Sequence, residues 1–329
     1  MERRVSMGDV AAAAGVSAQT VSRVVNDSPR VDPATRARVE DAMALLGYQI
    51  NRTARALRTG RFHTIGVVVA TLATVGNSRM LEAVAASAAR RGLALTVVTL
   101  TGREGVADAF ARLQEQGVDG AVVLNEATAI AGDAAPPPGL RVVAVDSPRP
   151  AATDAVTFAT VQSDHAGGAA AATRHLRERG HATVHHLAGP ETSFAAAERE
   201  RGWRETLAAA GADAPAPERG DWSAASGHAA GMRLAADPRV TAVFAANDQM
   251  ALGLIRALSD AGRAVGDDVH VVGYDDVADA AEFRPPLTTV RQDFDALGEA
   301  AVTALVAAID GTPATHTVVP TSLVLRASA

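Results

Sequence analysis

The chain of 329 residues lacks several features, and each absence excludes a class of site. It contains no cysteine, which excludes disulfides, cysteine-ligated zinc and thiol catalysis. No apolar run approaches the roughly 18 residues that predict a membrane-spanning helix. Residues 1–14 do not resemble a secretory signal, because Gly8 and Asp9 interrupt a short apolar run. We therefore expect a cytoplasmic protein with no membrane partner.

Lysine is also absent, so all 31 basic residues are arginines, and the charge is unevenly distributed. Residues 1–61 contain ten arginines and six acidic residues, a local net charge of +4, whereas the rest of the chain carries −10. A basic N-terminal segment on an acidic body suggests contact with nucleic acid, although chance clustering accounts for the asymmetry equally well.

Three short helices are expected before residue 49. Ser6 begins the first, which Gly15 ends, and Ser17 begins a second that reaches Asn26. A third is expected over residues 33–46. The turn of about four residues between the first two helices is typical of a helix-turn-helix.

The second of these helices has one apolar and one polar face. Its apolar face is expected to pack on the other two helices and carries Val21, Val24 and Val25. Its polar face carries Ala18, Gln19, Ser22 and Arg23. Gln19 can pair with adenine and Arg23 with guanine, while Thr20, Ser22 and Asn26 suit phosphate contacts. The alternative is a three-helix bundle with a solvated polar face.

Residues 10–11, 14–17, 20–26 and 47–48 carry a longer pattern than helix spacing alone. This pattern resembles the lactose/galactose repressor family of bacterial transcription regulators. The resemblance implies that residues 1–48 form a DNA-binding head. The operator contacts that it implies are Ser17, Ala18, Gln19, Thr20, Ser22, Arg23, Asn26 and Thr35.

Residues 49–61 are expected to form a hinge between the head and the rest of the chain. So short a helix rarely forms in water by itself. The resemblance implies that it folds on the operator, contacts DNA through Asn51 and Ala54, and inserts Leu57 into a base step of the minor groove. Ile50 stands where the family usually has proline, so the start of this helix is less sharply defined. The alternative is a flexible basic linker.

From residue 62 onward, apolar runs alternate with helical patterns. The run over residues 64–69 is typical of a parallel strand buried on both faces, and the alternation predicts two doubly wound parallel sheets. A helix is expected over residues 79–91 and a late one over 294–309. The resemblance implies an α/β core like a periplasmic binding protein over residues 62–329. Its two subdomains would be residues 62–161 with 293–320 and residues 162–292 with 321–329.

Polar residues follow three of the predicted strands: Asp146, Asn247 and Asp275. Ligands bind at the carboxyl ends of parallel strands, and carboxylates and amides can hydrogen-bond to sugar hydroxyls. The alternative is that these residues only cap the helices that follow.

The resemblance is densest after residue 180, and the pattern is most similar to the lactose-responsive members. It implies a sugar pocket lined by Asp146, Arg199, Trp222, Asn247, Asp275, Gln292 and Phe294. Trp222 would stack on a sugar ring or else be a core residue, whereas Trp203 is expected in the core. The opposite wall departs from those members at Ala70, Thr74, Gly76, Asn77 and Met80. The sugar therefore stays open among galactosides, glucosides and oligosaccharides.

These observations predict a homodimeric repressor that a sugar releases from a pseudo-palindromic operator. A corepressor-type regulator of the same family is the nearer alternative, and a sugar-binding transport protein the more distant one. We expect no enzyme and no cofactor, because phosphate-binding and nucleophile motifs are absent at strand-to-helix turns. We expect no metal either, since His185 and His186 lie in a predicted strand and point to opposite faces.

Overall fold

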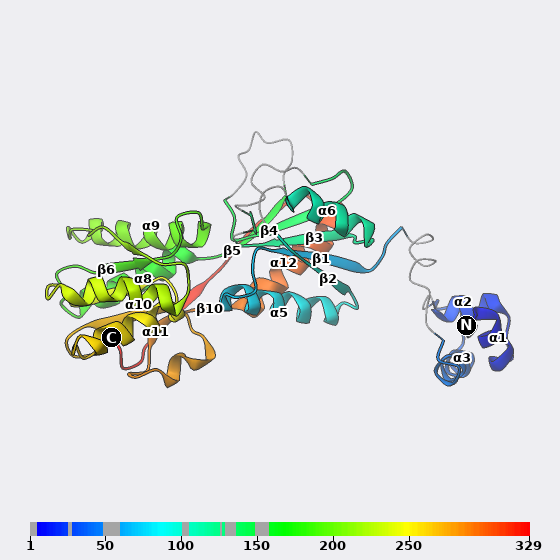
Figure 1. Cartoon of the computed structure of the whole chain (residues 1–329). Coiled ribbons are helices and arrows are strands. Elements are labelled where there is room, and N and C mark those ends of the chain that lie inside the picture. The colour runs from blue at the N-terminus through cyan, green and yellow to red at the C-terminus, as the bar shows by residue number, and fades with distance from the viewer. Residues whose placement is uncertain are drawn as a thin grey trace. The chain divides into compact units, whose positions relative to one another are not determined.

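The structure is a computed structural model, and it describes residues 5–25, 28–48, 60–100, 105–125, 127–128, 136–148 and 158–329. The chain divides into two compact units (Figure 1): residues 1–62 contain the head, and residues 63–329 form the core. Four predicted DNA contacts lie outside the described residues: Asn26, Asn51, Ala54 and Leu57. In the part of the chain that is described, no helix is long and apolar enough to cross a membrane.

The head consists of α1 (Met7–Ala14), α2 (Ala18–Val25) and α3 (Pro33–Leu45), in agreement with the three predicted helices. Ser6 caps α1: its hydroxyl accepts from the Asp9 amide, and the Asp9 carboxylate accepts from the Ser6 amide at 2.8 Å. Gly15 adopts a φ of +65°, which ends α1 before the turn into α2. Small apolar side chains from the three helices fill the centre of the head: Val10, Ala11, Ala14, Val21, Val24, Val39 and Ala42.

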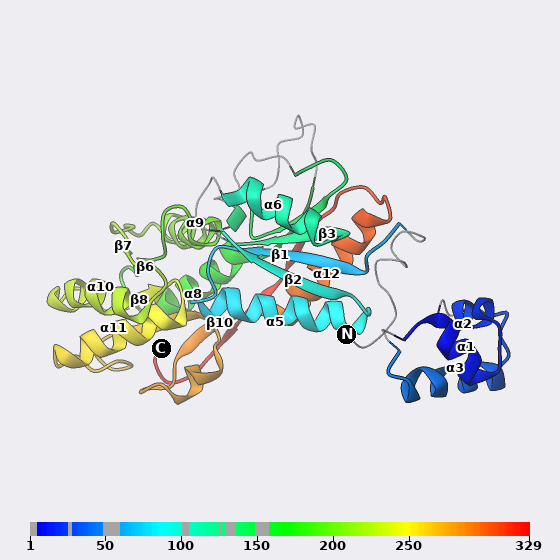
Figure 2. The same ribbon diagram turned by 45° about the vertical axis from the view of Figure 1, so that its right-hand side comes forward.

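The first sheet of the core contains six parallel strands in the order β11-β5-β4-β3-β1-β2. These are β1 (Thr64–Val69), β2 (Ala94–Thr99), β3 (Gly120–Leu124), β4 (Arg141–Val145), β5 (Ala159–Ser163) and β11 (His316–Val319). Successive residues of β1 face opposite sides of the sheet, so Val67 packs with α5 (Val75–Arg90) and α12 (Phe294–Ile309), and Val68 with α6 (Gly105–Glu115). Figure 2 shows α5 and α12 on one side of the strands and α6 on the other.

The second sheet has the order β12-β10-β9-β8-β6-β7. Its strands are β6 (His185–Ala188), β7 (Glu218–Arg219), β8 (Ala242–Ala245), β9 (His270–Asp275), β10 (Thr288–Gln292) and β12 (Thr321–Val324). Its helices are α8 (His165–Glu178) and α9 (Phe194–Ala209) against one face, and α10 (Ala224–Ala236) and α11 (Asp248–Asp260) against the other. A short 3-10 helix, η1, covers Ala278–Glu282. The parallel prediction needs one correction, because β12 is antiparallel to β10.

The chain crosses between the two sheets three times. It leaves the first sheet after Ser163, returns to it between Gln292 and Phe294, and passes back at Pro320, between β11 and β12. Segments far apart in sequence therefore meet at the crossings between the sheets. β5 of the first sheet and β10 of the second both end at such a crossing.

Two details of the core differ from the sequence prediction. α5 begins at Val75, four residues before the expected helix, because the Thr74 hydroxyl accepts from the Asn77 amide and caps it. α10 was not predicted, since glycines lower the helix propensity of its sequence. One of those glycines has a packing role: a Cβ at Gly227 would lie 2.3 Å from the Met250 carbonyl oxygen, so only glycine lets α10 approach α11 so closely.

Candidate functional site

A partly open cleft lies at the carboxyl ends of strands from both sheets, the place where α/β folds bind small molecules. All seven residues predicted to contact a sugar line it: Asp146, Arg199, Trp222, Asn247, Asp275, Gln292 and Phe294. Five further residues complete the lining: Thr74, Gly76, Asn77, Asn125 and Ala195. Of these, Asn125 and Ala195 were missed from the sequence. Met80, expected in the same wall, lies instead in the first-sheet core, 1% exposed.

The strands explain why these residues converge. Asn125 and Asp146 directly follow β3 and β4 of the first sheet, while Asp275 and Gln292 end β9 and β10 of the second. Neighbouring parallel strands end at one edge of a sheet, so each sheet presents its polar side chains along that edge. Position at a strand end indicated Asp146, Asn247 and Asp275 from the sequence, whereas Arg199, Trp222, Gln292 and Phe294 were predicted from the family resemblance.

Four residues of the cleft have backbones in the left-handed region. The φ angles are +46° at Asn125, +50° at Asp146, +75° at Trp222 and +112° at Asp275. Only six non-glycine residues in the described ranges have such angles, so most of them line the cleft. A left-handed backbone at a non-glycine residue costs about 1–3 kcal/mol and persists only where the surrounding structure enforces it. Strain concentrated in this way is typical of a binding site.

Arg199 of α9 is the buried cation of the cleft, 4% exposed. Its guanidinium lies 3.8 Å from the centre of the Tyr274 ring and 5.5 Å from that of Trp222. Its Nη1 donates to the carbonyl oxygen of Ala246, and its Nη2 lies 3.7 Å from Asp275 Oδ1. The aromatic faces, the carbonyl and the carboxylate together compensate for the lost hydration of the charge.

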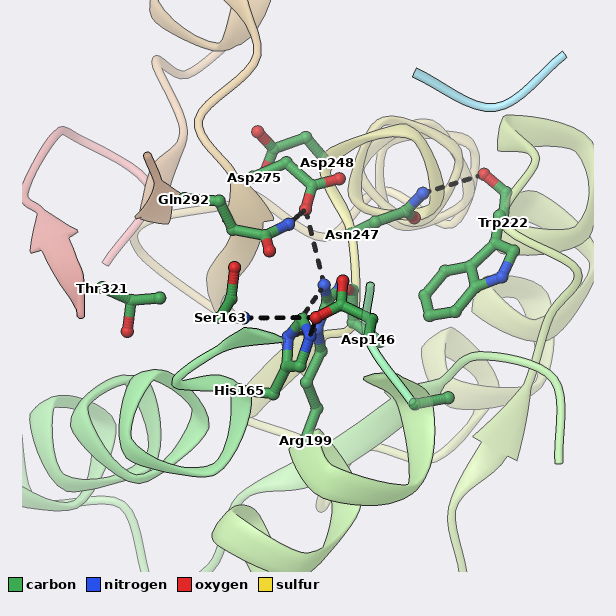
Figure 3. A network of polar contacts seen from close by, with 12 residues as sticks. Asp146, Ser163, His165, Arg199, Trp222, Asn247, Asp248, Asp275, Gln292 and Thr321 are labelled. Atoms are coloured by element: carbon green, nitrogen blue, oxygen red, sulfur yellow. Dashed lines mark hydrogen bonds and ion pairs between the residues drawn. The ribbon is translucent and has the colours of Figure 1, made fainter. Parts of the chain in front are cut away.

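Asp275 faces Arg199 from the end of β9. Burial raises the pKa of its carboxyl group, while the positive charge of Arg199 acts in the opposite direction. Gln292 Nε2 donates to Asp275 Oδ1 at 2.6 Å (Figure 3). Gln292 Oε1 is buried and has no hydrogen-bond partner among the described residues. A ligand hydroxyl that donated to this oxygen would satisfy it.

A second carboxyl group, that of Asp248, is fully buried behind Asp275. Burial, together with the negative charge of Asp275, raises its pKa to about 8. Thr289 donates its hydroxyl to Asp248 Oδ1 at 2.6 Å, and the Val277 amide donates to Oδ2 at 2.9 Å. Asp248 thus links α11, β10 and the segment after β9 beneath the cleft. Its sequence position after Asn247 gave no signal of this role.

Asp146 connects the first sheet to the crossing segment. Its Oδ1 accepts from the Ser163 amide at 3.2 Å and lies 2.8 Å from Nε2 of His165. His165 opens α8 and is 1% exposed, and its Nδ1 accepts from Nε of Arg199 at 3.4 Å. Figure 3 shows the His165 ring beside the ends of Asp146 and Arg199. Sequence reasoning missed His165, because its partners come from distant segments.

Trp222 has a backbone position fixed by Asn247. Asn247 caps α11 by accepting from the Met250 amide at 2.9 Å, and its Nδ2 donates to the Trp222 carbonyl oxygen at 3.0 Å. The indole lies so close to Gly189 that a Cβ there would come within 2.3 Å of the ring. Trp203 differs, as predicted: it is fully buried and donates Nε1–H to the Val184 carbonyl oxygen.

The head presents a polar surface on α2. Ser17, Ala18, Gln19 and Arg23 are exposed, while Thr20 and Ser22 of α2 and Thr35 of α3 are half-buried. Val21 and Val24 of the opposite face are buried against α1 and α3, and Val25 is half-buried. The arrangement leaves the predicted base-reading side chains free to enter a groove.

The histidine pair of β6 has a packing role. His186 is fully buried, stacks on Phe244 at 4.8 Å between ring centres, and has its pKa lowered to about 4 by burial. His185 is half-buried. Within the described ranges, no group of three or more histidine, cysteine, aspartate or glutamate residues is arranged to hold a metal ion.

Comparisons with known proteins cover both units. Residues 6–51 match the family described as bacterial regulatory proteins, lacI family, and residues 173–329 match a periplasmic binding protein-like domain. The lactose operon repressor of Escherichia coli (strain K12) is 37% identical, over 98% of this chain and 90% of its own length.

Two solved structures are also similar over nearly the whole chain. The lac repressor dimer bound to operator and the anti-inducer ONPF is 36% identical, with a TM-score of 0.86 over 99% of both chains. The transcriptional regulator CelR in complex with cellobiose is 35% identical, with a TM-score of 0.72 over 99% of this chain and 100% of that one.

Proposed function

This chain belongs to the lacI family of bacterial regulatory proteins, and from that premise we propose that it is a DNA-binding transcriptional repressor controlled by a small sugar. One observation carries the proposal. A helix-turn-helix head and a core whose cleft is lined by all seven predicted sugar contacts occur in the same chain. A transport protein for sugars needs no such head, and the relatives matched are regulators.

The head supports sequence-specific binding to an operator. Gln19 and Arg23 are exposed on the face of α2 that faces away from the valines, and these side chains pair with adenine and guanine edges in a major groove. Ser17, Thr20, Ser22 and Thr35 add hydroxyl groups suited to phosphate contacts. The operator-bound relative is a dimer, so we propose a homodimer on two half-sites of a pseudo-palindrome in the cytoplasm.

The cleft supports a neutral, hydroxyl-rich effector. Asp146, Asp275 and Gln292 offer buried oxygen acceptors, and Arg199 offers N–H donors. Trp222 and Phe294 offer apolar surface for the C–H faces of a pyranose. A galactoside, a glucoside or an oligosaccharide has this combination of groups. Cellobiose in the CelR complex and the operon named for lactose make both disaccharides rational first choices.

The sugar is proposed to act as an inducer. It lowers operator affinity if it binds more tightly to a core conformation that is incompatible with paired heads on DNA. A corepressor would have the opposite preference and would raise operator affinity. An inducer and a corepressor therefore change operator affinity in opposite directions when the sugar is added.

The test begins with selecting operator sequences from random DNA, followed by titration with lactose, cellobiose and related disaccharides. We expect one disaccharide to weaken operator binding by wild-type protein. Arg23→Ala should weaken operator binding by about 1–3 kcal/mol and change binding to random DNA far less. Failure of the chain to select any DNA sequence would refute the repressor. Equal losses on both DNAs would make Arg23 a phosphate contact.

A further inference from the structure

We propose that His165 is the positioning residue of the effector site, which holds Asp146 and Arg199 at the separation that lets both contact one effector. The proposal rests on the proposed function, because it concerns the same cleft. His165 is not among the residues that line the cleft. Its effect on an effector would therefore pass through its two charged neighbours.

The position of His165 in the chain suits it to this task. It is the first residue of α8, directly after the crossing from the first sheet to the second. Asp146 follows β4 of the first sheet, and Arg199 lies on α9 of the second. The Ser163 amide, two residues before His165, donates to the same Asp146 oxygen that His165 approaches. The crossing segment thus contacts that carboxylate at two points.

The contacts of the two ring nitrogens define the protonation of His165. Arg199 Nε and Nη2 lie 3.4 and 3.3 Å from Nδ1. A guanidinium can only donate, so Nδ1 is the acceptor and carries no proton. The single ring proton is then on Nε2, which lies 2.8 Å from Asp146 Oδ1. A neutral histidine of this tautomer accepts from the cation through Nδ1. Its Nε2 lies within ion-pair distance of the Asp146 carboxylate but has no hydrogen-bond partner among the described residues.

The surroundings hold the ring in place. His165 is 1% exposed, and its ring centre lies 6.4 Å from that of Phe194 and 6.1 Å from that of Tyr274. Without the imidazole, Asp146 Oδ1 loses its 2.8 Å contact with Nε2 and keeps the hydrogen bond from the Ser163 amide, while Arg199 loses an acceptor. The opposite charges would then be drawn toward each other and away from the effector. A neutral ring in contact with both charged side chains prevents this collapse.

The experiment compares His165→Gln with His165→Leu in the full-length chain. Glutamine keeps an N–H donor near the position of Nε2 and an oxygen acceptor, whereas leucine fills the space and offers neither. Lactose and cellobiose binding is measured by calorimetry. We expect His165→Leu to weaken binding of the responsive sugar about 10- to 100-fold and His165→Gln to remain within about threefold of wild type. His181→Leu, a histidine remote from the cleft residues, is the matched control and should leave sugar affinity unchanged.

Two readouts need no sugar. In the wild type, nitrogen-15 NMR should show His165 protonated on Nε2 and unprotonated on Nδ1. Hydrogen exchange of the Ser163 amide should accelerate at least about tenfold in His165→Leu but not in His165→Gln, because Asp146 accepts from that amide. A proton on Nδ1, or unchanged Ser163 exchange in folded His165→Leu, would overturn the proposal whether or not a sugar is found. Equal sugar affinity of wild type and leucine variant would overturn it as well. A missing sugar response with both ligand-free results intact would instead contradict the proposed function.

Discussion

The two walls of the cleft differ in the size and charge of their side chains. The second-sheet wall is an interlocked buried network: Arg199 lies on Tyr274 and near Asp275, and Gln292 donates to Asp275. The first-sheet wall, at Thr74, Gly76 and Asn77, consists of small or short polar side chains at the start of α5. We infer that the second-sheet wall recognises features common to many sugars, while the first-sheet wall distinguishes one sugar from another.

The largest expected effect follows from breaking the second-sheet wall. Arg199→Leu leaves the buried Asp275 carboxylate without its cation, so the free energy of unfolding should fall by about 3–5 kcal/mol. Arg233→Leu is the control, because its pair with Glu218 is more than half exposed on the arginine side, and it should cost about 0–1 kcal/mol. Urea denaturation of both variants measures the difference. Similar losses would mean that Arg199 does not anchor this wall.

The pH dependence of stability tests Asp248, the buried carboxyl group next to Asp275 of the second-sheet wall. Its folded pKa of about 8 lies above its ordinary value of 3.8, so the folded state binds more protons than the unfolded state between these pH values. Stability should therefore fall as pH rises from about 4 to 8, by roughly 1 kcal/mol per pH unit from this group, and level off above 8. Asp248→Asn should remove this contribution. An identical slope in urea denaturation of variant and wild type would show that Asp248 is not the group responsible.

Trp222→Ala tests the apolar part of the second-sheet wall. Loss of the indole should weaken sugar binding by about 1–3 kcal/mol through lost contact area. Trp222→Phe should recover part of this. Operator affinity without sugar should not change, since Trp222 belongs to the core. Calorimetry with the responsive disaccharide measures sugar affinity, and fluorescence anisotropy measures operator affinity. Unchanged sugar affinity in the alanine variant would place the ring outside the contact surface.

The smallest expected effect comes from a substitution at Gly76 in the first-sheet wall. A Cβ at Gly76 meets no atom within 4 Å, so Gly76→Leu should fold normally and extend into the cleft. We expect the preference between lactose and cellobiose to change by about tenfold, with Gly76→Ala closer to wild type. A second-sheet variant such as Asp275→Asn should weaken both sugars together. If Gly76→Leu also weakens both equally, the proposed division between the walls is wrong.

The sequence predicted those parts of the molecule that depend on local chemistry. β1 and α12 have the bounds expected for them, because a buried parallel strand and a capped apolar helix are legible in short windows. Asp146 and Asp275 were found because a charged residue at the end of an apolar run is conspicuous. Trp203 was assigned to the core from its apolar neighbours.

Other parts depend on contacts between distant segments, which one sequence does not reveal. His165 is recognisable only after β4, α8 and α9 are brought together, since its two partners lie 19 and 34 residues away. Asn125 follows a strand as Asp146 does, but an asparagine at such a position is equally typical of an ordinary turn. The glycines of α10 lower its local helix propensity and are favoured by packing against α11.

In the proposed function, a sugar bound in the cleft controls DNA binding by the head. The most direct test is operator affinity as a function of concentration of the responsive disaccharide, for wild type and for Asp275→Ala. We expect both proteins to bind the operator equally without sugar, and the sugar to release only the wild type at moderate concentration. Release of folded Asp275→Ala protein at the same sugar concentration as wild type would contradict it.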